Sequence, residues 1–131
     1  MQVEAVLGDI TQQGGCTTGD AKATPGFGLK ARWVIHTVGP PWAGGTNGEE
    51  NALRSCYRRC LEVADELGAA SVTFPAISAG AFGYPSQQAA VIALSTLLRT
   101  PTGVVLARLV AFDRQTFQLY RDGLDTWRAG S

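Results

Sequence analysis

A turn with two glycines, set between an apolar strand and an alanine-rich helix, constrains this chain more than any other segment. The strand covers residues 72–76, the turn 77–85 reads ISAGAFGYP, and the helix follows from about 86 to 99. Backbone N–H groups in such a turn can approach a phosphate closely, and the N-terminal end of the next helix adds partial positive charge. Phe82 and Tyr84 could cover a sugar or a pyrophosphate. The segment therefore predicts a phosphate-binding turn for a nucleotide-like ligand.

The same turn has a purely structural interpretation. Glycine-rich strand-to-helix turns also occur in α/β proteins because the chain must reverse direction sharply. The turn is not a P-loop, since no Gly-Lys-Ser/Thr follows it, and it is not a G-x-G-x-x-G dinucleotide motif. The turn alone leaves both interpretations open, so other segments must decide between them.

Composition describes one domain spanning residues 1–131. Eleven basic and eleven acidic residues cancel, and no basic stretch stands out. A nucleic-acid surface that works by phosphate neutralisation is therefore not expected, although backbone amides could still hold a nucleotide. No run approaches the roughly 20 apolar residues of a membrane span, and residues 1–5 lack a secretory signal pattern.

The cysteines point to a reducing compartment. Cys16, Cys56 and Cys60 make an odd count without the spacing of a disulfide framework, which favours free thiols in the cytoplasm. Cys56 and Cys60 are four residues apart and share one face of a helix. His36 is the single histidine, so two small core residues account for this pair better than a zinc site. We expect neither a metal nor a cofactor.

Strands and helices alternate along the chain, which predicts an α/β sandwich with helices on both faces of a largely buried sheet. Asn47 and Glu50 resemble a capping box at the start of the helix expected at 49–67, and Gly68 ends that helix. Asp113 is placed to cap the last helix. The expected strands are 3–7, 32–38, 71–76 and 104–112, with a short extended piece at 21–24, and the expected helices are 49–67, 86–99 and 114–128.

Ligands of such folds gather beyond the carboxyl ends of the strands. Asp9 and Ile10 follow the first strand, the glycine turn follows the third long strand, and Phe112 with Asp113 ends the last strand. Three separate segments are therefore expected to meet at one rim of the sheet.

Four motifs, in order along the chain, resemble a macro domain. They are Gly-Asp-Ile-Thr at 8–11, Gly-Asp-Ala at 19–21, VIHTVGP at 34–40, and FPAISAG at 74–80 continuing to Gly-Tyr-Pro at 83–85. The chain is most similar to the bacterial and mitochondrial type that removes ADP-ribose from proteins or acetyl from O-acetyl-ADP-ribose. The resemblance implies a three-layer α/β/α sandwich with a mixed, largely parallel sheet.

The resemblance also implies an ADP-ribose cleft. Asp9 would accept a hydrogen bond from the adenine amino group, and Ile10 would contribute an adjoining backbone amide. Phe82 would cover the distal ribose, and Phe112 would lie against the adenine, although a core position for Phe112 is the competing interpretation. The pyrophosphate would be wrapped by backbone N–H groups of the turn: Ser78, Ala79, Gly80, Ala81, Phe82 and Gly83. The implied partners are ADP-ribose, an ADP-ribosylated protein or O-acetyl-ADP-ribose.

The chain departs from the family pattern between Thr11 and Gly19. In relatives a strand, a loop carrying asparagine and aspartate, and a helix stand between these two motifs, whereas here only residues 12–18 connect them. The absent loop holds the distal ribose and orients the attacking water in hydrolysing relatives. Because hydrolysis needs that alignment, family-type catalysis is not expected and no catalytic residue can be assigned.

The shortening also removes one central strand and one helix from the expected sheet. Strands 71–76 and 32–37 must then pair directly or leave backbone groups unpaired, and buried unpaired groups cost about 1–3 kcal/mol each. Sheet contraction, strand exchange with a second copy, or a longer form of the chain are the alternatives. The sequence thus supports an ADP-ribose-binding module, an enzyme of the same ancestry, or a shortened module that self-associates.

Overall fold

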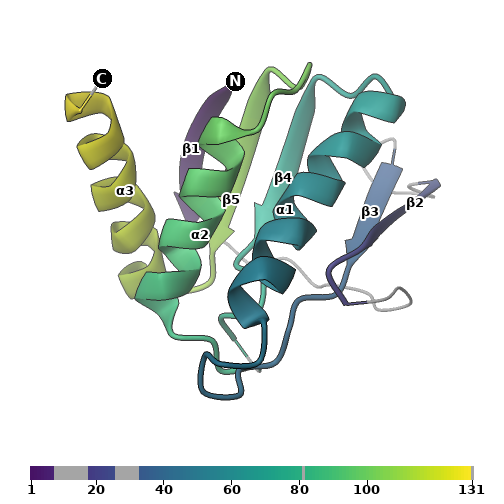
Figure 1. Ribbon diagram of the computed structural model, residues 1–131. Coiled ribbons are helices and arrows are strands. Elements are labelled where there is room, and N and C mark those ends of the chain that lie inside the picture. The colour runs from purple at the N-terminus through teal and green to yellow at the C-terminus, as the bar shows by residue number, and fades with distance from the viewer. Residues whose placement is uncertain (8–17, 26–32, 81, 131) are drawn as a thin grey trace.

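The computed structural model describes residues 1–7, 18–25, 33–80 and 82–130 (Figure 1). Within these ranges strands and helices alternate much as the sequence predicts. The elements are β1 (Gln2–Leu7), β2 (Ala21–Pro25), β3 (Trp33–Thr37), α1 (Glu49–Glu66), β4 (Ser71–Pro75), α2 (Ser86–Arg99), β5 (Leu106–Ala111) and α3 (Arg114–Ala129).

The described strands form two small sheets. The first is parallel, in the order β1-β5-β4, so β5 is its central strand. Leu106 of β5 pairs with Gln2 of β1 on one side and with Ser71 of β4 on the other. The second is the antiparallel pair β2-β3, with Ala21 opposite Thr37. In Figure 1 the strands follow one another across the molecule as β1, β5, β4, β3 and β2, so the two sheets are neighbours. Parallel and antiparallel pairing together give the mixed α/β fold that the sequence predicts.

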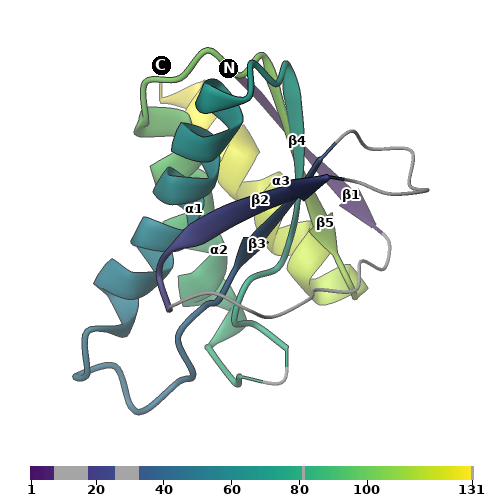
Figure 2. The ribbon, with the colours of Figure 1, turned by 90° about the vertical axis from the view of Figure 1, so that its right-hand side faces the viewer.

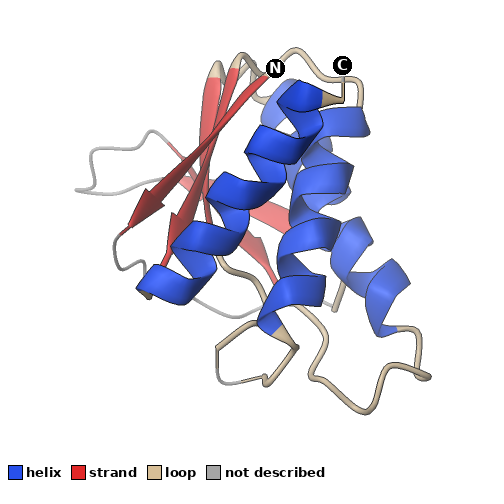
Figure 3. Ribbon diagram, turned by 90° about the vertical axis from the view of Figure 1, so that its left-hand side faces the viewer, coloured by secondary structure: helices blue, strands red, loops and turns tan. Residues whose placement is uncertain are grey.

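The three helices gather on one side of the strands, so that helices and strands form two layers in Figure 3. Phe74 of β4 and Leu109 of β5, adjacent in the register, are both buried. Ser71 and Thr73, which alternate with Phe74 along β4, are exposed. This alternation is typical of a sheet that is covered on one face. Of the two helical layers expected around the sheet, the described residues supply one.

Strands β3 and β4 do not pair with each other within the described residues. β4 pairs with β5 and β3 pairs with β2, in separate sheets. The sequence left direct pairing of these two strands open, and the structure does not have it. Helix α1 instead packs over both sheets: it contacts β2 and β3, and its Tyr57 ring lies 5.4 Å from the Phe74 ring of β4.

Helix α1 owes its position to an apolar stripe at helical spacing. Its buried face comprises Leu53, Cys56, Tyr57, Cys60, Leu61, Val63 and Ala64. Both cysteines are buried in this core, as the sequence predicts for the pair. Cys16 lies outside the described residues.

The ends of α1 show one wrong prediction and one confirmed one. The N-cap is Gly48, with φ 76° and no side-chain cap, so the capping box of Asn47 and Glu50 does not form. At the other end Gly68, with φ 68°, donates to the Asp65 carbonyl at 3.1 Å, and the Ala69 N–H donates to the Ala64 carbonyl at 2.9 Å. This pair of bonds is the Schellman arrangement, which needs a left-handed residue, and Gly68 ends the helix as predicted.

Helices α2 and α3 pack closely because Gly123 has no side chain. A Cβ at Gly123 would collide with the Leu94 side chain of α2. Asp113 caps α3 as predicted, accepting a 2.7 Å hydrogen bond from the Thr116 N–H. Tyr120 and Leu124 are buried, whereas Trp127 at the end of the same stripe is 40% exposed and lies under the Arg99 guanidinium, 5.7 Å from its ring centroid. Among the described residues no helix has the length and apolarity needed to span a membrane.

Candidate functional site

The glycine turn between β4 and α2 is anchored in the core at both ends and exposed between them. Ile77 and Tyr84 are buried, with exposed fractions of 2% and 3%, whereas Phe82 is 45% exposed. Gly80 and Gly83 are exposed as well. The turn therefore presents a short stretch of backbone to solvent, and the buried residues Ile77 and Tyr84 hold its two ends in place.

Hydrogen bonds within the turn decide which of its N–H groups remain for a ligand. The N–H of Ala79 donates to Ala76, that of Gly83 to Gly80 at 3.0 Å, and that of Tyr84 to Ser78 at 3.0 Å. The N–H groups of Gly80 and Phe82 have no acceptor among the described residues. Of the sequence-predicted phosphate-binding residues, Gly80 and Phe82 are exposed and keep such a donor. The Ser78 N–H has no acceptor among the described residues either, but Ser78 is buried, whereas Ala79 and Gly83 use their N–H groups to hold the turn's shape. Ala81 lies outside the described residues.

Ser78 takes an unusual conformation in this turn. Its φ is 65°, the left-handed region that non-glycine residues rarely adopt, and such strain is often found at functional sites. Its side chain is 8% exposed, and its hydroxyl has no hydrogen-bond partner among the described residues. The hydroxyl faces Gly39, where an added Cβ would collide with both Ser78 and Ile77. Gly39 thus allows the loop after β3 to pass directly against the turn.

The loop before α1 supports the other side of the turn. The Trp42 N–H donates a 2.8 Å hydrogen bond to the Phe82 carbonyl, and the Trp42 and Tyr84 rings lie 4.8 Å apart. In Figure 2 this loop and the turn lie at the same end of the molecule. The turn is therefore held from two sides by residues 39–42, leaving its outer edge free.

Glu49 shapes that supporting loop, and the sequence did not single it out. One carboxylate oxygen accepts from the N–H of Gly45 at 2.8 Å and of Ala43 at 2.9 Å, and the other accepts from Asn47 at 2.6 Å. These backbone donors, Gly45 first and then Ala43, lower the Glu49 pKa to about 2. The sequence feature that could have identified Glu49 is an acidic residue in the first turn of a helix that follows a glycine-rich loop.

The rim at the end of β5 carries an exposed aromatic ring. Phe112 is 52% exposed, so it does not belong to the core, and its neighbour Asp113 is occupied as the cap of α3. Strand β1 ends beside β5, with Leu7 in register with Ala111. Asp9 and Ile10 lie outside the described residues, so the adenine contacts expected of them stay predictions.

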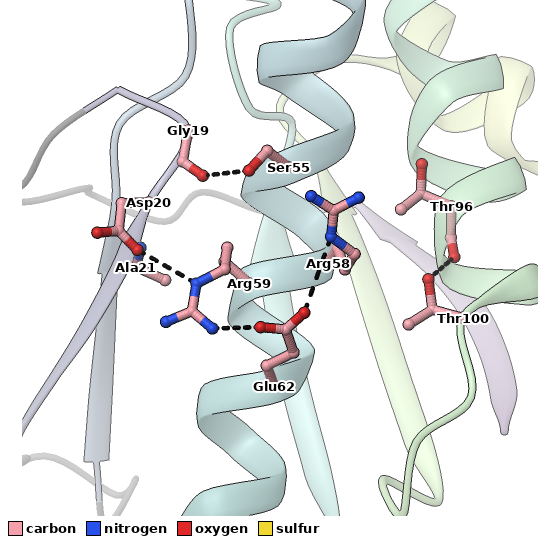
Figure 4. Close-up of polar contacts among 9 residues, drawn as sticks. All are labelled: Gly19, Asp20, Ala21, Ser55, Arg58, Arg59, Glu62, Thr96 and Thr100. Atoms are coloured by element: carbon pink, nitrogen blue, oxygen red, sulfur yellow. Dashed lines mark hydrogen bonds and ion pairs between the residues drawn. The ribbon is translucent and has the colours of Figure 1, made fainter.

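Asp20, in the Gly-Asp-Ala motif, joins the β2-β3 pair to helix α1 (Figure 4). Its carboxylate accepts from the Ala21 N–H at 2.8 Å and from Arg59 Nε at 3.3 Å, and these two bonds lower the Asp20 pKa. Next to it, the Ser55 hydroxyl donates to the Gly19 carbonyl at 2.7 Å. Arg59 also pairs with Glu62. Asp20 thus fastens β2 to α1, which gives its carboxylate a structural role.

The described residues contain no group of three His, Cys, Asp or Glu side chains that could hold a metal ion. His36 is half-buried within β3, where it has an interaction partner. The rings of Phe82, in the glycine turn, and of Phe112, at the end of β5, are both exposed.

Known proteins are similar to this chain in sequence. A family model described as Macro domain matches residues 2–93. A macro domain-containing protein of Methanosarcina mazei is 50% identical over 91 residues, which cover 70% of this chain and 49% of that protein. An O-acetyl-ADP-ribose deacetylase of Salmonella newport is 46% identical over 112 residues, covering 83% of this chain and 63% of that protein.

A solved structure agrees in fold. A mutant of the Oceanobacillus iheyensis macrodomain with ADPR has a TM-score of 0.81 at 36% identity, over 87% of this chain and 62% of that chain. The chain therefore spans about half to two thirds of the length of the relatives described above. From the family-model match over residues 2–93 and the identity to these relatives, the chain belongs to the macro domain family.

Proposed function

We propose that the chain recognises ADP-ribose, free or attached to a protein, and holds its diphosphate on the turn between β4 and α2. The carrying observation is that two exposed residues of the turn, Gly80 and Phe82, have N–H groups without an acceptor among the described residues. Backbone donors in such a turn suit an anion without needing a basic side chain. The similarity to a macrodomain structure with ADPR supports this ligand.

The donors at the turn supply affinity, and the aromatic residues at the rim supply selectivity. A hydrogen bond to a charged group contributes about 1.5–3 kcal/mol. The exposed ring of Phe112 is available to stack on the adenine, and that of Phe82 to cover the distal ribose. The turn is already shaped by its internal hydrogen bonds and by Trp42, so binding a ligand costs little conformational entropy in the turn.

Calorimetric titration with ADP-ribose tests the proposal, with AMP and ribose 5-phosphate as partial ligands. ADP-ribose should bind and each fragment should bind more weakly, because each lacks one end of the ligand. Gly80→Pro removes one of the two donors and should weaken binding about tenfold or more. Gly80→Ala is the matched control, since it keeps the N–H and its Cβ would meet nothing within 4 Å. No heat with ADP-ribose at high micromolar protein would overturn the proposal.

Removal of acetyl or of protein-linked ADP-ribose is the second candidate function, favoured by the relative that is an O-acetyl-ADP-ribose deacetylase. The short connection from Thr11 to Gly19 lacks the asparagine and aspartate that hydrolysing relatives use. We therefore propose binding without turnover. Release of acetate from O-acetyl-ADP-ribose, or of ADP-ribose from a modified acidic side chain, at the rate of a full-length relative would contradict this view.

A further inference from the structure

A groove opens between the N-terminal ends of α1 and α2, on the helix side of the glycine turn. Its volume is about 390 Å³, and its lining includes Trp42, Arg54, Tyr84, Gln88, Val91 and Ile92. None of the roles described above uses this groove, although Trp42 and Tyr84 also support the turn. We call it the Val91 groove.

One wall of the Val91 groove is apolar. The rings of Trp42 and Tyr84 lie against each other, with their centroids 4.8 Å apart, and Ile92, which also lines the groove, is buried. Val91 is 58% exposed on the same helix, a large exposure for a valine that lines a hollow surface. Such a wall can take an apolar side chain from a partner.

The remaining lining is polar but has no net charge. Arg54 is bound to Glu50 at 2.9 Å and also donates to the Ser95 hydroxyl at 3.1 Å. Gln87 and Gln88 are exposed, and each amide can donate and accept a hydrogen bond. A neutralised guanidinium does not favour a phosphate, whereas amides beside an apolar wall match the alternating N–H, C=O and side chains of a polypeptide.

The position of the Val91 groove ties it to the proposed ligand. Trp42 lines the groove and donates its N–H to the Phe82 carbonyl, and Tyr84 lines the groove at the end of the same turn. A diphosphate on the turn would therefore lie next to the groove, separated from it by the Trp42–Tyr84 pair. A protein attached to ADP-ribose must continue from the ligand across the adjoining surface.

We infer that the Val91 groove binds the polypeptide that carries the ADP-ribosyl group, with an apolar side chain of that polypeptide between Val91 and the Trp42–Tyr84 pair. This inference rests on the proposed function, because the ADP-ribosyl group delivers the polypeptide to the groove. It predicts that a modified protein binds more tightly than free ADP-ribose.

The test compares three ligands by calorimetry or fluorescence anisotropy: free ADP-ribose, a peptide carrying ADP-ribose on a glutamine amide with a leucine nearby, and the unmodified peptide. The modified peptide should bind about tenfold more tightly than free ADP-ribose, the gain expected from burying one apolar side chain. Val91→Glu should remove that gain and leave the affinity for free ADP-ribose unchanged.

Two further variants make the result specific to the Val91 groove. Val105→Glu is the matched control, because Val105 is an equally solvent-facing valine, 66% exposed, that does not line the groove. It should retain the tighter binding of the modified peptide. Gln88→Ala should weaken the modified peptide severalfold, as expected from losing one hydrogen bond of about 1 kcal/mol, without affecting free ADP-ribose. Thermal melting of each variant verifies that it is folded.

The outcomes separate the two claims. If free ADP-ribose binds but the modified peptide binds no more tightly, and Val91→Glu alters neither, the groove inference is overturned while the proposed function stands. If wild-type protein binds neither ligand, the proposed function fails and the groove inference fails with it.

Discussion

The backbone N–H of Trp42 lies 2.8 Å from the carbonyl oxygen of Phe82 and donates to it. This bond joins the loop before α1 to the glycine turn before α2, two segments about forty positions apart in the chain. Because Glu49 organises the same loop through three backbone N–H groups, the shape of the turn depends on residues that do not touch the proposed ligand. The predictions below test this dependence and the roles of the rim residues.

Gly39→Ala should destabilise the protein and weaken ADP-ribose binding together. The new Cβ would collide with the side chains of Ser78 and Ile77, which are both buried, so these side chains or the backbone around them must shift. Overpacking of this kind costs about 1–3 kcal/mol. Thermal unfolding and calorimetry with ADP-ribose measure the two effects. Gly80→Ala, which has open space for its Cβ, should change the melting temperature far less. An unchanged melting temperature for Gly39→Ala would contradict the contact.

Glu49→Gln should lower stability at neutral pH, and the loss should shrink as the solution is acidified. The pKa of Glu49 is about 2 in the folded protein, against an ordinary value of 4.5. A carboxylate with a lowered pKa stabilises the fold above its unfolded pKa, and this contribution disappears as pH falls through the folded value. The difference between wild type and variant should therefore be full above about pH 4.5 and decline toward pH 2.

Urea unfolding at a series of pH values measures this effect. Glu50→Gln is the control, because Glu50 makes an exposed ion pair with Arg54 at 2.9 Å, and exposed pairs contribute little. A pH dependence that is equally large for both variants would show that the three N–H groups are not what stabilises the charged form of Glu49.

Phe112→Ala should weaken ADP-ribose binding without changing stability. Phe112 is 52% exposed, and surface substitutions away from special features usually change stability by less than about 0.5 kcal/mol. Loss of stacking on the adenine should cost about 1–3 kcal/mol of binding free energy. Calorimetry with ADP-ribose gives the affinity, and Val105→Ala serves as an exposed control. Unaltered affinity would place the adenine elsewhere.

Asp20→Asn should loosen the β2-β3 pair while leaving ADP-ribose binding intact. The Asp20 carboxylate accepts from Ala21 and Arg59, and an amide accepts these bonds less strongly because it carries no charge. Hydrogen exchange should speed up at the amides of β2 and β3 but stay slow in β5, which belongs to the other sheet. Loss of ADP-ribose binding in a folded Asp20→Asn protein would instead place this carboxylate in the binding site.

The edge of β4 that faces away from β5 should exchange its amides quickly. The Leu106 N–H donates to Ala70 at 3.1 Å, so by the alternation of a parallel ladder Val72 and Phe74 share bonds with β5 while Thr73 points away. Pro75, like Thr73, faces away from β5, so the N–H that proline lacks is not needed for pairing with that strand. The Thr73 amide should therefore exchange faster than those of Val72 and Phe74. Protection that increases with protein concentration would indicate strand pairing between copies.

Much of the architecture was predictable because its signals are local. The stripe from Leu53 to Ala64 identifies α1 and its buried face, and Gly68 and Asp113 mark helix ends through hydrogen bonds within a few residues. The prediction of a capping box at Asn47 and Glu50 was wrong. The carboxylate that accepts from the Asn47 N–H belongs to Glu49, one position earlier, and the path of the loop that it binds depends on Trp42.

The binding turn was predictable as a segment but not in its detail. Glycine content and the flanking strand and helix located residues 77–85, whereas the internal bonds of Ala79 and Gly83 decide which donors remain. Such bonds depend on the φ values of Ser78 and Gly83, 65° and 72°, which composition does not specify.

The sequence by itself determined the α/β order of elements, the faces that become core, and membership in a recognisable motif series, because each depends on spacing along the chain. Only the tertiary structure decided that β3 and β4 lie in separate sheets under one helix, that Gly39 admits the Ser78 hydroxyl, and that Glu49 holds the loop behind the turn. These features depend on contacts between groups brought together from distant positions, and no local pattern encodes which distant groups will meet.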